Sequence, residues 1–159
     1  MQLTIALIAI AIAGTTVTYA AETAMARELK AILASRKIPR DLEITYSDMH
    51  GLWGGQTIVI SGQGTGERTE KTRGSSEPRI TKTAIRSEDL LGFIKLMIDL
   101  QAWDQRTPER TPVPDESRAA LTITVSQQSS TVWEWFNDMS RNKRLTVLRQ
   151  KMAELTASP

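Results

Sequence analysis

Residues 42–61 read LEITYSDMHGLWGGQTIVIS, and this stretch decides the fold. Apolar and polar side chains alternate over 42–47 and again over 56–61, which is the pattern of strands with one buried face. The segment 48–55 between them is rich in glycine and too long for a tight two-residue hairpin. Two half-buried strands in succession predict an antiparallel sheet that is covered on one face.

Outside this stretch, apolar residues at helical spacing predict three helices. The first covers 22–36. The second covers 87–103, with Ser87 as its expected N-cap, and its narrow polar side indicates the central packing element. A third helix is expected after a cap at Asn137 or Ser140.

Further strands are expected on both sides of the second helix, together with one uncertain segment that either extends the strand at 56–61 or forms a short strand. The strands are 79–86, 119–127 and 131–136, the uncertain segment is 68–73, and a turn is expected at 128–130. The element order is α, β-β-(β)-β, α, β-β, α. Short connections favour antiparallel pairing, so the sequence predicts a single α+β domain over 22–159 with helices packed on the sheet.

The segment 1–21 precedes this domain and carries no charged side chain. Its apolar core is followed by small residues, which is typical of an export signal that is cleaved. The uncharged stretch is also just long enough to anchor the chain in a membrane, and an internal core helix is the third interpretation. With either of the first two, the domain is exported and faces the far side of a membrane, in the periplasm or outside the cell.

Composition excludes several kinds of site. The chain has no cysteine, so disulfides, cysteine-based zinc sites and thiol nucleophiles are absent. Its 20 Lys and Arg against 18 Asp and Glu give a net charge of +2, which does not argue for a nucleic-acid partner. Five basic residues gather over 141–153; a solvated helix face is favoured, and contact with lipid headgroups or a polymer is the alternative. No cofactor is expected.

His50 is the only histidine and follows Asp48 within the glycine-rich segment. Such a pair suits a general base or part of a metal site, and a hydrolase that uses both residues is one hypothesis. A zinc centre needs three or four ligands, and no further histidine or cysteine completes one. No known catalytic motif appears elsewhere. A solvated turn histidine is therefore favoured, with no catalytic or metal-binding residue assigned.

Tryptophans supply the better binding candidates. Trp53 and its neighbour Leu52 are apolar residues in a segment that is expected to be a loop, so both are candidate contact residues beside His50. Trp133 and Trp135 lie two apart on a predicted strand and therefore share one face of the sheet. Packing beneath a helix is favoured for this pair, and an exposed platform for a sugar or peptide is the alternative.

The glycine-rich turn at 51–55, the strand that follows it and the leucine-rich segment 87–103 resemble small exported bacterial α+β domains. Domains with this layout include the emfourin-type inhibitors of thermolysin-like proteases and several uncharacterised bacterial domains. The resemblance covers about half of the domain and implies its architecture. Here Trp53 precedes Gly54 and Gly55, which departs from the order of these residues in that family. No functional residue is therefore carried over.

The sequence thus predicts an exported, non-enzymatic domain that binds a protein or an envelope polymer through His50, Leu52 and Trp53, with Trp133 and Trp135 as further candidates. A hydrolase that uses Asp48 and His50 is one alternative. A scaffold held at the membrane by residues 1–21 is the other.

Overall fold

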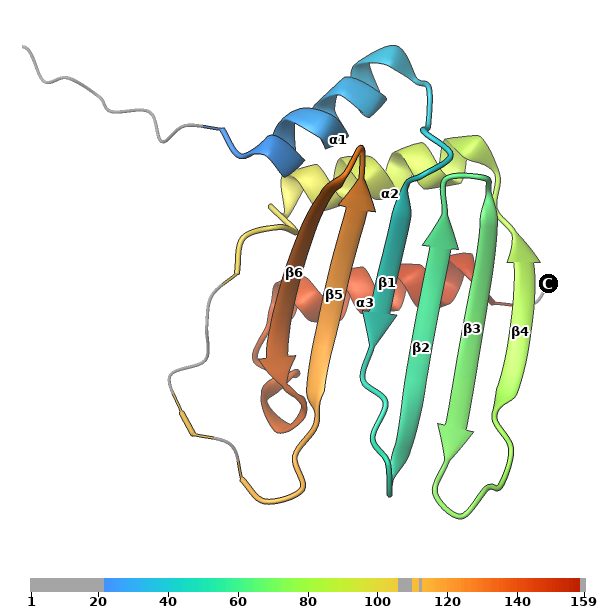
Figure 1. Ribbon diagram of the computed structural model, residues 1–159, viewed down its shortest axis with the longest axis vertical. Coiled ribbons are helices and arrows are strands. Elements are labelled where there is room, and N and C mark those ends of the chain that lie inside the picture. The colour runs from blue at the N-terminus through green and yellow to red at the C-terminus, as the bar shows by residue number, and fades with distance from the viewer. Residues whose placement is uncertain (1–21, 106–109, 112, 158–159) are drawn as a thin grey trace, which may run out of the picture.

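The computed structural model describes residues 22–105, 110–111 and 113–157, so the segment 1–21 and its expected signal or anchor lie outside it. The described chain forms one six-stranded sheet and three α-helices (Figure 1). The strands are β1 (Glu43–Ser47), β2 (Gly54–Ser61), β3 (Thr65–Thr72), β4 (Arg79–Ala84), β5 (Arg118–Val125) and β6 (Gln128–Trp135). The helices are α1 (Ala24–Ser35), α2 (Ser87–Asp99) and α3 (Lys143–Leu155), and a 3-10 turn, η1, spans Phe136–Asp138.

The strand order is β4-β3-β2-β1-β5-β6, and every neighbouring pair is antiparallel. This confirms the predicted α+β class. None of the described helices has the length and apolar character that a membrane crossing requires.

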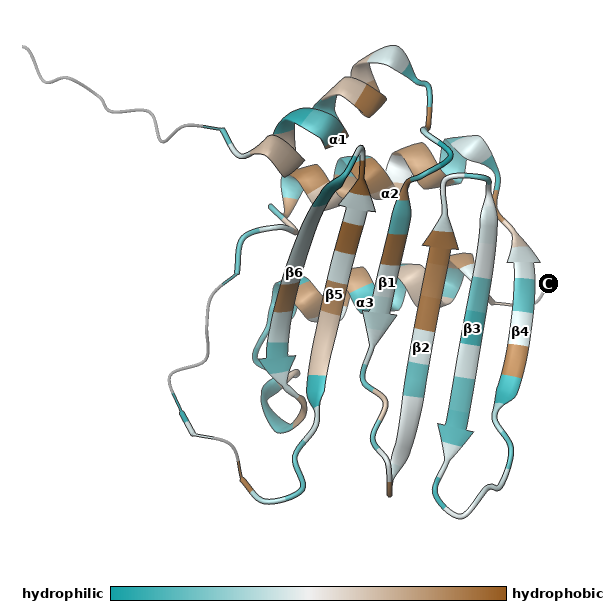
Figure 2. Cartoon of the chain, in the orientation of Figure 1, coloured by the Kyte–Doolittle hydropathy of each residue, from teal (hydrophilic) through white to brown (hydrophobic). Residues whose placement is uncertain are grey.

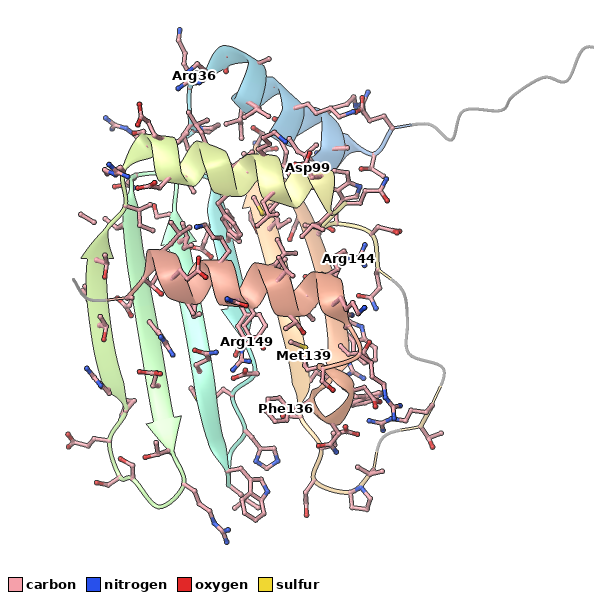
Figure 3. The ribbon with its side chains drawn as sticks, turned by 180° about the vertical axis from the view of Figure 1, so that it is seen from behind. Arg36, Asp99, Phe136, Met139, Arg144 and Arg149 are labelled. Atoms are coloured by element: carbon pink, nitrogen blue, oxygen red, sulfur yellow. The ribbon has the colours of Figure 1, made fainter. Side chains whose placement is uncertain are left out.

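Helices α2 and α3 lie behind the same face of the sheet, and α1 packs beside α2 at the end that carries the β5–β6 turn (Figures 1 and 3). The alternation of the central strands explains why, because every second side chain points to that face. Ile44, Ile58 and Leu121 are fully buried there, and Phe93 of α2 and Leu148 of α3 are buried within the same core. Figure 2 shows that the apolar residues concentrate on the central strands, whereas β3 and β4 are mostly hydrophilic.

Several predicted boundaries were wrong. Residues 65–72 form a full strand of their own, β3, which pairs along its length with β2. Helix α2 ends at Asp99 and follows Arg86 as its N-cap residue rather than Ser87. The cap of α3 is Asn142, whose side chain accepts a hydrogen bond from the Leu145 amide at 3.1 Å, whereas the predicted Asn137 lies in η1.

The turn between β5 and β6 lies at Ser126 and Gln127 and not at 128–130. Both residues have positive φ angles, 49° and 65°, as a type I′ hairpin turn requires. Ser-Gln carries no typical signature of this turn, and the two flanking strands impose the conformation.

The two edges of the sheet differ. At the β6 edge, the Gln105 side-chain amide donates to the Trp133 carbonyl at 3.2 Å and accepts from the Trp133 amide at 2.6 Å. A side chain thus takes the hydrogen-bonding position of a further strand. At the other edge, β4 carries Arg79 and Lys82, and such charges are typical of an edge strand that is left open.

The helices do not reach the whole length of the sheet. In both Figure 1 and Figure 3, the end that carries the β1–β2 connection extends beyond α3. Polar side chains therefore occupy the helix-facing side there: Asp48 follows β1, Gln56 lies on β2, and Glu70 is paired with Gln56 on β3. This uncovered end holds the candidate site.

The strained β5–β6 turn gives a first prediction. Replacing Ser126 and Gln127 by Asn and Gly should raise the free energy of unfolding by about 1 kcal/mol, because Asn and Gly adopt positive φ at lower cost. Urea unfolding of the full chain measures it. Gln127→Ala is the matched control and should give no gain, since it keeps a Cβ; equal gains in both variants would contradict the prediction.

Candidate functional site

The site is built around the tip of the β1–β2 connection, residues 48–55, called the tip below. His50 and Gly54 pair across it through two backbone hydrogen bonds of 2.8 and 3.1 Å. Gly54 has a φ of 82°, and a Cβ at this position would lie 2.0 Å from the Lys71 carbonyl oxygen. Only glycine fits there, so the tip is pressed against β3 and held in one conformation.

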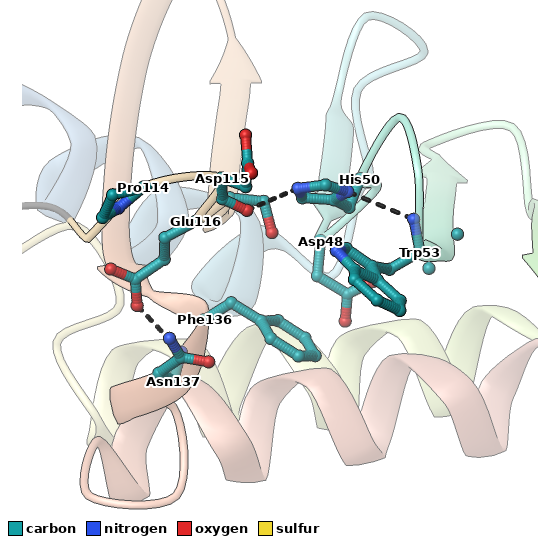
Figure 4. A pocket seen from close by; sticks show the side chains of 11 residues that line it. Asp48, His50, Trp53, Pro114, Asp115, Glu116, Phe136 and Asn137 are labelled. Atoms are coloured by element: carbon teal, nitrogen blue, oxygen red, sulfur yellow. Dashed lines mark hydrogen bonds between the residues drawn. The ribbon is translucent and has the colours of Figure 1, made fainter. Parts of the chain in front are cut away.

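His50 braces the tip with its ring (Figure 4). Its Nδ1 accepts hydrogen bonds from the backbone amides of Leu52 at 3.0 Å and Trp53 at 3.2 Å. An Nδ1 that accepts carries no proton, so the ring proton is on Nε2, which donates to the Asp115 carbonyl at 2.6 Å. The ring therefore links the tip to a segment 65 residues further along the chain.

Leu52 and Trp53 are held exposed by this arrangement. Their exposed fractions are 68% and 54%, which is unusual for large apolar residues on an ordered turn. The Arg73 guanidinium lies 4.0 Å from the centroid of the Trp53 ring and covers one of its faces. The structure thus brings together His50, Leu52 and Trp53, the three tip residues that the sequence selected.

A cavity of about 540 Å³ lies beside the tip. Its walls come from the tip, from residues 114–117 and from η1, and they include His50, Trp53, Pro114, Glu116 and Phe136 (Figure 4). It is called the tip cavity below. Apolar rings and polar groups alternate around it, which is typical of a surface that receives part of another molecule.

The far wall of the tip cavity is fixed by an ion-pair network that the sequence did not indicate. Arg110 donates to both oxygens of the Glu116 carboxylate, at 2.6 and 2.8 Å, and to Asp138 at 2.6 Å. The Glu116 side chain is only 1% exposed. Hydrogen bonds from Arg110 lower the pKa of Glu116 to about 2, and those from Glu116 and Asp138 raise the pKa of Arg110.

Asp48 plays a structural part. It is 3% exposed and accepts hydrogen bonds from the Tyr46 hydroxyl at 2.9 Å and the Gln56 amide at 2.7 Å. Arg149 of α3 pairs with it, at 3.4 Å between Nε and Oδ2. Burial, and then the nearby Asp48 charge, raise the pKa of Tyr46.

The geometry gives little support to a hydrolase that uses Asp48 and His50. Asp48 and His50 line the same cavity, but both ring nitrogens of His50 are engaged by backbone groups. Within the described part of the chain, no three His, Asp or Glu side chains are placed to hold a metal ion. In this arrangement neither nitrogen of the His50 ring is free to take a proton from a substrate.

Trp133 and Trp135 share one face, as predicted, with ring centroids 5.1 Å apart in an edge-to-face arrangement. The expected packing beneath a helix was wrong. Their partners in register on β5 are Ala120 and Arg118, which alternate with the buried Leu121, so the pair lies on the face opposite the helices.

Guanidinium groups cover this tryptophan pair. Arg118 lies 4.1 Å from the Trp133 ring centroid and 5.0 Å from that of Trp135. The indole nitrogen of Trp135 donates to the Arg110 carbonyl at 3.3 Å. The rings thus form a layered stack with arginine side chains, which leaves less open ring surface than a sugar platform needs.

The basic residues of 141–153 do not act as one solvated face. Arg149 points to the sheet and pairs with Asp48, while Arg144 donates to the Gln101 carbonyl at 3.0 Å and to the Asp104 carbonyl. Lys151 pairs along the helix with Glu154. Two of these arginines therefore tie α3 to neighbouring elements.

No protein-family model matches the chain, and no curated protein matches it. The function is therefore inferred from the geometry of the tip and its cavity.

The Arg110–Glu116 pair predicts acid sensitivity of the cavity wall. Because folding lowers the pKa of Glu116 from 4.5 to about 2, its stabilisation is present above pH 4.5 and is lost as the pH falls toward 2. Glu116→Gln should lower the unfolding free energy at pH 7 and reduce its dependence on pH in this window. Urea unfolding from pH 7 to 2 measures both effects. Glu77→Gln, at an exposed position, is the control and should leave the pH profile unchanged.

The bonding of His50 predicts its tautomer. Nitrogen chemical shifts of the ring should show the proton on Nε2 at neutral pH. Nδ1 should be the unprotonated nitrogen, because it accepts from the Leu52 and Trp53 amides. A ring protonated on Nδ1 at neutral pH would contradict the arrangement.

Proposed function

We propose that the chain is a non-catalytic binding domain that recognises another protein through the tip and the tip cavity. One observation carries the proposal: Leu52 and Trp53 are exposed on a turn that is held in place by the His50 ring. Exposed apolar side chains that are already ordered lose little conformational entropy on binding, which favours a contact surface.

A protein is favoured over an envelope polymer because of how the aromatic rings are covered. Arg73 lies over Trp53, and Arg118 lies over the Trp133 and Trp135 pair. A glycan platform needs open ring faces for its sugars. Tryptophan and arginine are instead among the residue types that contribute most of the binding energy in protein–protein interfaces.

The place of action is part of the same proposal. The uncharged segment 1–21 has the composition of an export signal or an anchor, so we propose that the domain works on the far side of a membrane. The emfourin resemblance suggests the first partner to test, a thermolysin-like protease. A scaffold that residues 1–21 hold at the membrane would differ from this exported binding domain only in being attached, and its contact surface would be the same.

The test is a binding measurement on the full chain with a catalytically inactive thermolysin-like protease, and with partners found by placing a photo-crosslinker at position 52. Trp53→Ala should weaken binding by tenfold or more while leaving the unfolding free energy within about 0.5 kcal/mol, because the side chain is exposed. Val147→Ala, an exposed apolar position on α3, is the matched control and should leave binding unchanged.

Two results would contradict the proposal. If Trp53→Ala unfolds the chain, the ring is part of the core rather than a contact. If binding to an identified and purified partner is equal in the Trp53→Ala and Val147→Ala variants, the tip does not form the interface.

A further inference from the structure

A second, smaller cavity of about 220 Å³ adjoins the tip cavity on the helix-facing side of the sheet. Its walls include Gln56 of β2, Arg68 and Glu70 of β3, Phe136 and Arg149. We call it the arginine recess. It shares Asp48, Gly55 and Phe136 with the tip cavity, so the two cavities are direct neighbours. Figure 3 shows Arg149 and Phe136 at the edge of the sheet end that the helices leave uncovered.

Two buried polar atoms of residues that line the recess have no partner, namely Gln56 Oε1 and Arg68 Nε. Arg149 Nε makes no hydrogen bond either, but it forms the 3.4 Å ion pair with Asp48. Gln56 is only 6% exposed. A buried polar group without a partner costs about 1–3 kcal/mol, so native proteins rarely leave one unexplained. Two such atoms beside one small cavity, together with an arginine that is held by an ion pair alone, indicate that the cavity can receive a polar group from outside.

The acidic side chains of the recess are already engaged. Asp48 accepts from the Tyr46 hydroxyl and from the backbone N–H of Gln56, and Glu70 accepts from Arg68 Nη2 at 2.6 Å. The two guanidinium groups have more N–H donors than these carboxylates accept, since each guanidinium carries five. The guanidinium groups of the recess can therefore donate further hydrogen bonds to an acceptor from outside.

We infer that the arginine recess binds a carboxylate group. The planar fork of a guanidinium matches a carboxylate, and the Gln56 amide can turn its NH₂ toward the same oxygens. A cation is disfavoured by Arg68 and Arg149. A doubly charged phosphate is disfavoured because Asp48 and Glu70 lie in the same wall. A singly charged, planar anion satisfies the donors with the least repulsion.

The position of the recess next to the tip cavity indicates which chemical group lies beside this carboxylate in the ligand. A ligand that reaches the recess through the tip cavity passes Trp53 and Phe136, so an apolar group next to the carboxylate is expected. The end of a polypeptide with a large apolar last residue and an acidic side chain both meet this description. That the carboxylate comes from a protein rests on the proposed function, whereas carboxylate binding itself does not.

The test uses four small probes on the full chain: N-acetyl-phenylalanine and its amide for a chain end, and N-acetyl-glutamate amide and N-acetyl-glutamine amide for a side chain. Nitrogen-detected spectra of the arginine Nε–H groups are the readout. We expect at least one carboxylate probe to shift the Arg68 and Arg149 signals in a saturable way, and its neutral partner to shift neither. Which carboxylate binds more tightly identifies the source.

Variants separate binding at the recess from binding elsewhere. Arg68→Gln and Arg149→Lys should each weaken carboxylate binding by tenfold or more. The lysine variant keeps a positive charge beside the buried Asp48, so the chain should still fold. Arg79→Gln on the exposed edge strand is the matched control and should leave binding unchanged. Equal responses to carboxylate and amide probes, no response at millimolar concentration, or equal losses in all three variants would overturn the inference. Because Trp53→Ala is not used here, this result is independent of the test of the tip.

Discussion

The site depends on one constraint: the helices cover a single face of the sheet and end before the sheet does. Ile44, Ile58 and Leu121 are buried where α2 and α3 pack, so the strands are apolar there. Beyond α3 the same face turns polar, with Asp48 and Gln56 in place of aliphatic side chains. Hydrogen bonds replace apolar packing as the source of order at this end, and both cavities form where the change takes place.

The order of the exposed tip also comes from hydrogen bonds rather than from burial. Leu52 and Trp53 donate their backbone amides to the His50 ring, so the turn is ordered although both side chains stay largely exposed. The opposite wall is fixed by Arg110 and Glu116. The two walls of the tip cavity are thus held by separate polar networks, and the hydrogen bond from His50 Nε2 to the Asp115 carbonyl joins them.

Local patterns predicted the α+β class, the period-two strands β1 and β5, and the tip with Leu52 and Trp53. They did not predict contacts set by sheet register or chain packing. Arg118 reaches the tryptophans only because β5 and β6 pair as they do, and Arg149 reaches Asp48 only because α3 crosses behind β1 and β2. The β5–β6 turn was misplaced because Ser126 and Gln127 adopt positive φ without the residues that usually signal it.

The hydrogen bonds between the Gln105 side chain and the edge strand β6 affect how two copies of this chain can pair through their sheets. Edge-to-edge growth of sheets into fibres needs two free edges on each copy, so that every added molecule presents a new one. On β6 the Gln105 side chain already occupies the backbone amide and carbonyl of Trp133. A strand of another copy can pair along the whole of β6 only after Gln105 is displaced, which disfavours repeated addition at this edge.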